Sequence, residues 1–383
     1  MSARLWTVGL GLLNQANFHG GTERFEARVG VRLVKHADPW RWRVYTRGVL
    51  PAEWTGATGF EEVPCAPTRA MRGGRIWSEQ VSWPLALRRR PPDLLLTLAF
   101  SPPLASTLPT VMTVHDVTPL ERPGDYAPAA RWYWRQVLRE IAPRSRRILV
   151  PSEWARQRCA EVLGYPAERI DVVHSGVEPH FFADGSAREP DGVLSRLGVS
   201  EPFWLHCGVA HPRKNLEVAI RALALIRRRG HESPILLRVG SQSAYLERMR
   251  ALARDLGVAD RFLDAGSVND RELAGLYARS AAFLYPSWAE GFGVPPLEAM
   301  ASGAPVLASR ITCLPEILGD TPFWGNPSEP ESWVDAWDAC ASQSEEERRA
   351  RADRAREWAR RYTWDATAAL CLGALRRAVE SLS

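Results

Sequence analysis

The feature that most constrains the fold is a repeated alternation of short apolar runs with segments of helical period. In the first half the apolar runs are RLWTVGLGLL, WRVYTRG, DLLLTLAF, TVMTVHD and RILVPS. In the second half they are FWLHCGVA, ILLRVGS, RFLDAGSV, AAFLYPS and APVLAS. Most lack alternating polar residues, which indicates strands covered on both faces, as in parallel sheets. The sequence therefore predicts an α/β protein that uses this plan twice.

Glycine, proline and helix-capping residues between these runs predict where helices and domains end. A helix is expected over residues 216–229, with Asn215 at its N-cap and Gly230 just beyond its end. The stretch EPHFFADGSAREPDG has no clear period and is rich in glycine, proline and acidic residues, so it predicts the boundary between the halves near 180–200. At roughly 100–200 residues per domain, the chain of 383 residues fits two domains.

Charge and cysteine usage exclude few classes of function. The net charge of +5 permits anionic partners such as nucleotides or lipid headgroups without demanding them. The six cysteines are scattered singly without metal-site spacing, so we expect reduced, mostly buried thiols of a cytosolic protein. The apolar N-terminus indicates a first strand rather than a signal peptide, and no run of about 18 apolar residues is present that could span a membrane.

Ligands of open parallel sheets bind beyond the carboxyl ends of the strands, so candidate residues are sought there. In FHGGTERF, Gly20 and Gly21 precede a helix expected to reach about Ala37. Glycine permits close backbone approach and a helix N-terminus presents N–H groups to an anion, although a simple tight turn would use the same residues. In TVHDVTP, His115 and Asp116 are expected to end a strand over 110–116. His115 can donate to a substrate hydroxyl there, or be a buried histidine with a backbone partner.

A basic turn follows the strand expected over 203–209. In GVAHPRKNLE, His211, Arg213 and Lys214 crowd the turn before a helix. Guanidinium, ammonium and free N–H groups can converge on an anion at such a helix N-terminus. A solvated basic turn is the alternative that the residues leave open.

The stretch SWAEGFGVPPLEAMASGAPVLAS places glycines and consecutive prolines between two glutamates. Gly291 and Gly293 allow unusual backbone angles and clear space for a ligand. The prolines can open a helix, since first-turn N–H groups have no intrahelical acceptor. Because proline itself lacks an N–H group, Gly293, Val294 and Leu297 remain as the expected donors.

The two glutamates of this stretch have different expected surroundings. We expect Glu298 in the first turn of the helix, where the macrodipole favours a carboxylate, and a plain capping role would also explain it. No local helix explains Glu290. A carboxylate there suits a pair of ribose or sugar hydroxyls, from which it can accept two hydrogen bonds.

A further segment, YAPAARWYWRQVLREIAPRSRR, mixes aromatic residues with arginines at helical spacing. Trp132, Tyr133 and Trp134 lie among Arg131 and Arg135. Such a helix can lie on an anionic membrane surface. An amphipathic core helix with solvated arginines is the alternative.

Taken together, these motifs resemble those of a retaining glycosyltransferase of family 4 in the GT-B class. The resemblance is carried by GVAHPRKNLEVAIRAL and by SVNDRELAGLYARSAAFLYPSWAEGFGVPPLEAMASGAPVLAS. Upstream, RIWSEQVSWPLALRRRPPDLLLTLAFSPP, TVMTVHDVTPLERPGDY and ILVPSEWARQRCAEVLGYPAERIDVVHSGVEPHFF fit the same family. It covers most of the chain and is weakest at 30–70 and 325–383. The two glutamates separated by seven residues are its most specific part.

The resemblance implies a GT-B architecture of two Rossmann-like domains whose parallel sheets face a central cleft. Residues 1–180, completed by a C-terminal helix over about 364–383, would bind the acceptor. Residues 181–363 would bind the nucleotide sugar. Many relatives carry an arginine after the glycine that matches Gly208, where this chain has Val209. Arg213 or His211 would compensate, as in the PRKN branch that this chain resembles.

The resemblance also implies roles for the candidate residues. Glu290 would hold hydroxyls of the transferred sugar, Glu298 the nucleotide ribose, and Lys214 with Arg213 the diphosphate. Gly20 and Gly21 would face the diphosphate, and His115 would contact the sugar near its reacting carbon, which makes His115, Lys214 and Glu290 the expected catalytic set. The backbone amides expected to reach the sugar and diphosphate are those of Gly291, Phe292, Gly293 and Val294.

The expected activity is glycosyl transfer with retention, from a nucleotide sugar such as GDP-mannose to a saccharide or lipid-linked acceptor. No Asp-any-Asp triplet is present, so we expect neither a metal nor another cofactor. We expect a cytoplasmic protein with a peripheral contact to the inner face of the membrane. A GT-B sugar-nucleotide epimerase, a phosphorylase and a nucleotide-binding regulator are the alternatives. No nucleic-acid partner is expected, because the basic residues are dispersed and the net charge is small.

Overall fold

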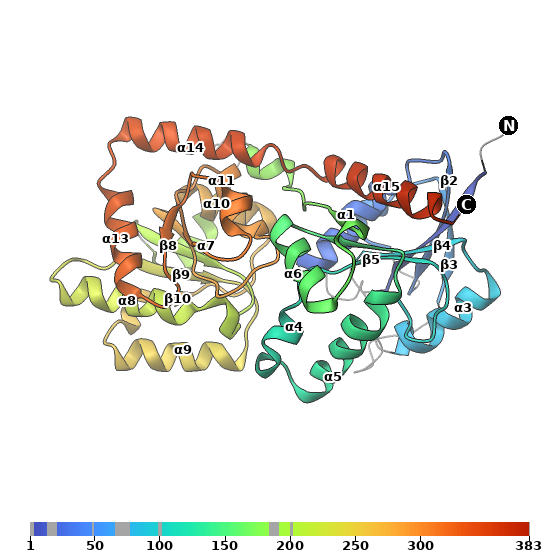
Figure 1. The fold of residues 1–383 in the computed structure, drawn as a ribbon. Helices are drawn as coiled ribbons and strands as arrows, with labels where there is room; N and C mark the ends of the chain where they lie inside the picture. Colours follow the sequence, from blue (N-terminus) through green and yellow to red (C-terminus); the bar gives the residue numbers. More distant parts are fainter. Residues whose placement is uncertain are drawn as a thin grey trace. The chain divides into compact units, whose positions relative to one another are not determined.

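The computed structural model describes residues 4–13, 21–47, 50–65, 77–98, 102–183, 191–199 and 202–382 (Figure 1). The chain divides into two compact units. Unit 1 comprises Met1–Gly176 and Trp364–Ser383, and unit 2 comprises Val177–Thr363. Each unit has its own parallel sheet, so the expected α/β fold with two Rossmann-like halves is confirmed.

Unit 1 is built on a seven-stranded sheet in the order β3-β2-β1-β4-β5-β6-β7, with every pair parallel. The strands are β1 Trp6–Leu12, β2 Trp40–Thr46, β3 Phe60–Pro64, β4 Leu94–Thr97, β5 Thr110–Thr113, β6 Arg147–Val150 and β7 Ile170–Val172. The described helices are α1 Gly21–Leu33, α3 Trp83–Arg89, α4 Thr118–Glu121, α5 Pro128–Gln136, α6 Glu153–Leu163 and α15 Trp364–Glu380. The strand order reverses between β1 and β4, the point at which such sheets bind ligands.

The C-terminal helix α15 belongs to unit 1 because its apolar face joins that core. Trp364, Cys371 and Leu375 are buried in one cluster with Phe25 and Val29 of α1. A buried carboxylate fixes the same helix from the sheet side, since Asp171 of β7 accepts from Arg147 over 3.0 Å and from Arg377 of α15 over 2.7 Å. Apolar burial and this ion pair together explain why a segment so far along the chain completes the first half.

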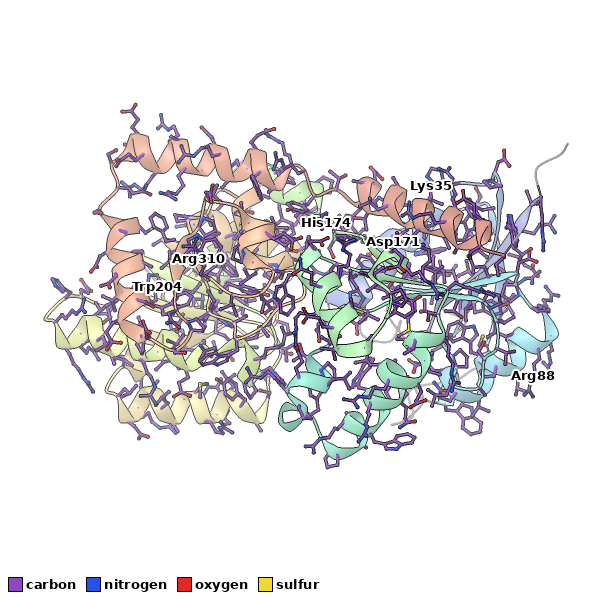
Figure 2. All side chains as sticks on the ribbon, in the orientation of Figure 1. Lys35, Arg88, Asp171, His174, Trp204 and Arg310 are labelled. Carbon is purple, nitrogen blue, oxygen red and sulfur yellow. The ribbon has the colours of Figure 1, made fainter. Side chains whose placement is uncertain are left out.

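Unit 2 is built on a six-stranded parallel sheet in the order β10-β9-β8-β11-β12-β13. The strands are β8 Phe203–Cys207, β9 Ile235–Val239, β10 Phe262–Asp264, β11 Ala282–Tyr285, β12 Val306–Ser309 and β13 Phe323–Gly325. The helices are α7 Asp191–Leu197, α8 Leu216–Arg228, α9 Ala244–Asp255, α10 Asp270–Arg279, α11 Val294–Ala301, α12 Leu314–Leu318, α13 Pro330–Ala341 and α14 Glu345–Ala359. Side chains fill the space around the sheet, and Trp204 of β8 is fully buried there (Figure 2).

All ten predicted strands are present, and the described part of the chain contains three further strands that were missed. The missed strands β3, β7 and β13 each lie at an edge of a sheet. An edge strand is short and partly exposed, so it lacks the continuous apolar run that identifies a central strand. The sequence of β3, FEEVP, shows this, because it carries two glutamates and a proline.

Several predicted boundaries were displaced. The helix that begins at Gly21 ends at Leu33 rather than near Ala37, and β5 ends at Thr113, so His115 lies beyond the strand. The basic, aromatic segment forms α5, which has no buried residue, followed by a π-turn over Val137–Ile141 in which Val137, Leu138 and Ile141 are buried. Within the described ranges, no helix combines the length and apolar character needed to cross a membrane.

Candidate active site

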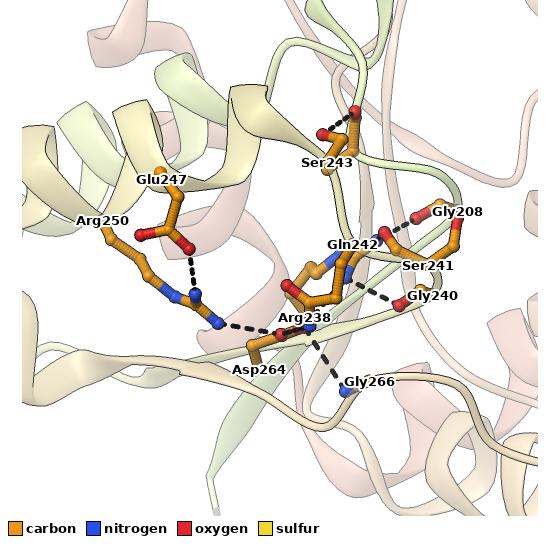
Figure 3. A network of polar contacts seen from close by, with 11 residues as sticks. Gly208, Arg238, Gly240, Ser241, Gln242, Ser243, Glu247, Arg250, Asp264 and Gly266 are labelled. Atoms are coloured by element: carbon orange, nitrogen blue, oxygen red, sulfur yellow. Dashed lines mark hydrogen bonds and ion pairs between the residues drawn. The ribbon is translucent and has the colours of Figure 1, made fainter.

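A buried guanidinium organises the carboxyl edge of the unit 2 sheet (Figure 3). Arg238 of β9 is fully buried and pairs with Asp264 of β10 over 2.9 Å. It also donates to the carbonyls of Gly208 and Gly240, each over 2.8 Å. Gly240 has φ 138°, and a Cβ there would lie 2.2 Å from the Gly208 oxygen, so glycine is required. The ends of three strands are therefore tied to one side chain.

The basic turn begins directly after this network. Residues Pro212–Lys214 form a single 3₁₀ turn, and His211 Nδ1 accepts from the backbone N–H of Arg213 over 3.2 Å. Asn215 occupies the N-cap position of α8 as predicted, but its side chain does not cap the helix. It adopts φ 52° and donates from Nδ2 to the carbonyl of Pro327 over 2.8 Å. This contact fixes the end of the turn that carries Lys214.

Three predicted residues meet in one cluster. Lys214 Nζ lies 2.8 Å from Glu290 Oε1 and 2.8 Å from the Tyr285 hydroxyl. Arg213 Nη1 lies 2.6 Å from Glu290 Oε2 and also donates to the carbonyl of Ala289 over 2.6 Å. The carboxylate is buried, and the side chains of Lys214 and Arg213 keep only 13% and 22% of their exposure. The basic turn is therefore not a solvated loop.

The charges of this cluster support one another. Burial raises the pKa of Glu290, but Arg213 and Lys214 outweigh that effect and hold the pKa at about 2. Burial lowers the pKa of Lys214, while Glu290 opposes this shift. Burial, with the nearby charges of Arg238 and Lys214, lowers the pKa of His206 to about 3, which keeps this histidine neutral. Two cations and one carboxylate leave a net positive charge in a partly desolvated site.

The second glutamate does not lie where the sequence placed it. Helix α11 begins at Val294, so Glu298 is its fifth residue and lies outside the first turn. A capping role is therefore wrong. Glu298 is 4% exposed, and its Oε2 accepts from the Tyr277 hydroxyl over 3.3 Å. Phe292 of the same loop is buried and packs edge-on against Tyr362, with ring centroids 5.6 Å apart.

One of the two glycines of this stretch requires its special geometry. Gly293 is the N-cap of α11 with φ 103°, and a Cβ there would lie 2.8 Å from Leu314 Cδ2. Gly291 does not adopt a positive φ, so the expectation of unusual angles there is wrong. Leu297 is the fourth residue of α11, where the N–H group has an intrahelical acceptor, so Leu297 is removed from the expected donors and Gly293 and Val294 are the ones that open the helix.

Sequence reasoning missed three side chains that hold the cluster. Tyr285 ends a predicted strand, and its contact with Lys214 has no local signal. Thr312 and Cys313 lie after β12, where Thr312 Oγ1 accepts from the Glu290 N–H over 3.3 Å. Cys313 Sγ lies 3.2 Å from the Glu290 carbonyl. These contacts join residues more than twenty positions apart, which no motif in the sequence reports.

In unit 1, His115 has a backbone partner. Its Nε2 lies 2.9 Å from the carbonyl of Leu98, and its ring packs nearly perpendicular to that of Phe25, with centroids 5.2 Å apart. Loss of hydration in this partly buried position lowers its pKa. A neutral ring that donates from Nε2 presents Nδ1 as an acceptor. His115 can therefore accept from a substrate hydroxyl, whereas the sequence had suggested donation.

The other unit 1 candidates are less constrained. Gly21 is the first residue of α1, and a Cβ there would meet nothing within 4 Å, so its backbone does not require glycine. Gly20 lies outside the described residues. Asp116 Oδ1 accepts from the Thr118 N–H over 2.9 Å, which is a local turn contact.

No group of histidine, cysteine or acidic side chains in the described ranges is arranged to hold a metal ion. The six cysteines are unpaired and five are buried, as predicted.

Two family models match successive parts of the chain. Glycosyltransferase Family 4 matches residues 19–181, and Glycosyl transferases group 1 matches residues 195–358. The structure of Anabaena HepE in complex with UDP and glucose has a TM-score of 0.73 at 18% identity, covering 97% of this chain and 100% of that chain. At this identity, the likeness shows a shared fold.

Two named relatives are similar to large parts of the chain. The serotype-specific mannosyltransferase WbdA of Escherichia coli is 30% identical over 282 residues, which cover 70% of this chain and 34% of that protein. The O-antigen chain mannosyltransferase RfbU of Salmonella typhimurium is 28% identical over 225 residues, 59% of each chain. The chain thus spans about a third of the first relative and three fifths of the second. With both halves matched and two Rossmann-like units observed, the chain belongs to the family 4 glycosyltransferases of the GT-B class.

Proposed function

We propose that this chain transfers a hexose, with retention at the anomeric carbon, from a nucleotide-sugar donor to a saccharide or lipid-linked acceptor. The observation that carries the proposal is the convergence of Lys214 and Arg213 on Glu290 at the carboxyl edge of the unit 2 sheet. Preorganised charges in a partly desolvated site stabilise the negative charge that develops on a leaving diphosphate. The net positive charge of the cluster matches such a ligand.

The same geometry supports a role for each glutamate. Each oxygen of the Glu290 carboxylate holds one cation and has a second lone-pair direction, so it can also accept from a sugar hydroxyl. Glu298, oriented by Tyr277, would hold the ribose hydroxyls. The amides of Gly293 and Val294 open α11 and would contribute donors to the diphosphate.

In the proposed step, the acceptor hydroxyl attacks the anomeric carbon on the face from which the diphosphate leaves. A carbon–oxygen bond to the acceptor forms as the bond to the phosphate oxygen breaks, and the acceptor proton passes to a departing phosphate oxygen. Lys214 and Arg213 would stabilise the charge on the diphosphate. His115, neutral with Nδ1 as an acceptor, would orient a hydroxyl of the transferred sugar.

We propose mannose as the transferred sugar and GDP-mannose as the donor, because the relatives named above are mannosyltransferases. We further propose that no metal is required, since Lys214 and Arg213 can supply the positive charge that a divalent ion supplies elsewhere. Unchanged turnover in the presence of EDTA is the expected result. A loss of activity that Mg²⁺ or Mn²⁺ restores would contradict it.

A thermal-shift screen with UDP-glucose, GDP-mannose, ADP-glucose and dTDP-glucose tests donor binding. A ligand at a hundred times its Kd stabilises by about 2.7 kcal/mol, which corresponds to a shift of about 5–10 °C for a domain of this size. Arg221→Ala, which removes an exposed ion pair on α8 outside the proposed site, should show the same shift as the wild type. The absence of a shift with every donor would contradict the proposal. Conversion of the donor sugar without acceptor would indicate an epimerase instead.

We also propose that α5 makes peripheral contact with anionic lipid. None of its residues is buried, and Trp132 is 61% exposed beside Arg131 and Arg135. Binding to phosphatidylglycerol vesicles, weakened as salt rises, is the expected result. Arg131→Ala with Arg135→Ala should reduce it, whereas Arg349→Ala on the exposed face of α14 should not. Equal binding to phosphatidylcholine vesicles would contradict electrostatic attachment.

A further inference from the structure

The segment after β12 makes a tight turn beside the Glu290 loop. The N–H of Leu314 donates to the carbonyl of Ile311 over 3.1 Å, so Thr312 and Cys313 are the two central residues of the turn. Thr312 has φ 48°, and Cys313 has φ −77° and ψ −12°. A positive φ at the first central position is the mark of primed turns, where glycine, asparagine or aspartate is usual.

Threonine is an unfavourable residue for this backbone. Among the described residues other than glycine, only Asn215 and Thr312 have a positive φ. Asparagine tolerates the left-handed region, whereas branching at Cβ makes it strained for threonine. Strained backbone persists where the surrounding structure holds it, and it concentrates at functional sites. The side chain of Thr312 is therefore expected to make a contact that glycine could not replace.

That contact is made to the peptide unit of Glu290. The Thr312 hydroxyl oxygen accepts from the Glu290 N–H over 3.3 Å. Next to it, the buried Cys313 Sγ lies 3.2 Å from the Glu290 carbonyl and 3.3 Å from the Phe292 carbonyl. Arg213 and Lys214 hold the carboxylate at the other end of the same residue. Glu290 is thus fixed at both its backbone and its side chain.

We propose that Thr312 is a positioning residue for Glu290, and that its unfavourable backbone is retained because its hydroxyl aims the Glu290 loop at the donor. The inference rests on the proposed donor-binding role of Glu290. A displacement of about 1 Å in such a group can cost about a hundredfold in rate. The gain from one contact that fixes Glu290 can therefore exceed the cost of the strained Thr312 backbone. Thr312 acts through Glu290 and need not touch the donor.

Three substitutions in the full chain separate positioning from plain structural support. Thr312→Ser keeps the hydroxyl, Thr312→Val keeps the branched shape without an acceptor, and Thr312→Gly removes both the acceptor and the strain. Glu290→Gln is the reference for the donor site. The readouts are the Kd for the nucleotide sugar that gives the largest shift among the four named above, measured by calorimetry, and the midpoint of urea denaturation.

Thr312→Ser is expected to bind the donor with a Kd close to that of the wild type, because it keeps the hydroxyl. Thr312→Val and Thr312→Gly are expected to weaken it about five- to tenfold, the effect of one lost hydrogen bond to a positioned group. The urea midpoint of Thr312→Gly should stay equal to or above that of the wild type, because relief of strain offsets the flexibility of glycine. Donor binding would then weaken without a loss of stability, which a structural role alone does not produce.

Three results would overturn the inference. In the first, Thr312→Val and Thr312→Gly bind the donor as the wild type does while Glu290→Gln binds weakly. Glu290 would then still be a donor-binding residue, but Thr312 would not be a positioning residue. The same follows if Thr312→Gly loses stability and binding in proportion. If Glu290→Gln binds the donor like the wild type, the donor-site assignment itself fails, and the positioning role fails with it.

Discussion

The carboxyl edges of the two sheets carry different kinds of side chain. In unit 2, charges are buried together, with Arg238 against Asp264 and with Lys214 and Arg213 against Glu290. At the unit 1 edge, His115 and Gln80 make neutral contacts with the backbone of the loops after β4. Buried paired charges suit an anionic ligand, whereas neutral donors and acceptors suit hydroxyl groups. Under the proposed function, the unit 2 edge would bind the donor diphosphate and the unit 1 edge would bind hydroxyl groups.

The buried ion pairs should also differ in their contribution to stability. Asp264→Asn leaves Arg238 fully buried without its counter-charge, which we expect to reduce the free energy of unfolding by about 3–5 kcal/mol. Asp171→Asn in unit 1 should cost less, about 1–2 kcal/mol, because Arg377 is half exposed and Arg147 keeps 12% of its exposure, so both cations can be hydrated in part. Urea denaturation of both variants measures the difference. Equal losses would show that burial does not distinguish the two pairs.

Removal of the unit 2 ammonium should produce the largest loss of activity. Lys214→Ala is expected to lower kcat about a hundredfold or more, because a preorganised charge on the leaving diphosphate is lost. Initial rates of nucleoside diphosphate release measure the effect, and Arg221→Ala on the exposed face of α8 serves as the control. Turnover near that of the wild type would remove Lys214 from the mechanism and weaken the contrast between the two edges.

The central architecture could be predicted from sequence because continuous apolar runs report burial on both faces. The edge strands β3, β7 and β13 could not, since a half-exposed strand such as FEEVP has no such run. Lys214, Arg213 and Glu290 were found because a specific motif carries them. Arg238 was not, because within ILLRVGS nothing local indicates that its guanidinium turns toward the Gly208 and Gly240 carbonyls. Contacts formed only by tertiary packing leave no local pattern.

Acidification should act first through buried histidines and only later through the active-site carboxylate. The pKa of His206 in the folded state is about 3, below the ordinary value of 6.5, so the unfolded chain binds a proton first and stability falls as pH drops below 6.5. The pKa of Glu290 is about 2 against an ordinary 4.5, so its contribution is complete above pH 4.5 and is lost as pH falls toward 2.

This order predicts that replacing His206 removes the loss of stability at mildly acidic pH. Between pH 6.5 and pH 5, protonation of the unfolded chain at His206 should lower the free energy of unfolding by about 2 kcal/mol. His206→Leu should remove that part of the pH dependence while leaving the loss below pH 4.5. Urea denaturation at several pH values measures both windows. If His206→Leu and the wild type lose stability equally between pH 6.5 and pH 5, His206 is not the responsible group.

The smallest of these effects is expected at the unit 1 edge and tests the specialisation directly. His115→Ala removes a neutral hydrogen-bonding group rather than a charge, so we expect kcat to fall about tenfold, the effect of one hydrogen bond. Its pKa is lowered, so the contact should be insensitive to pH above the ordinary histidine range. A hundredfold loss, or a rate that titrates near pH 6.5, would mean that His115 carries charge in the reaction. The two edges would then share the electrostatic work, and the division between an anion-binding half and a hydroxyl-binding half would be wrong.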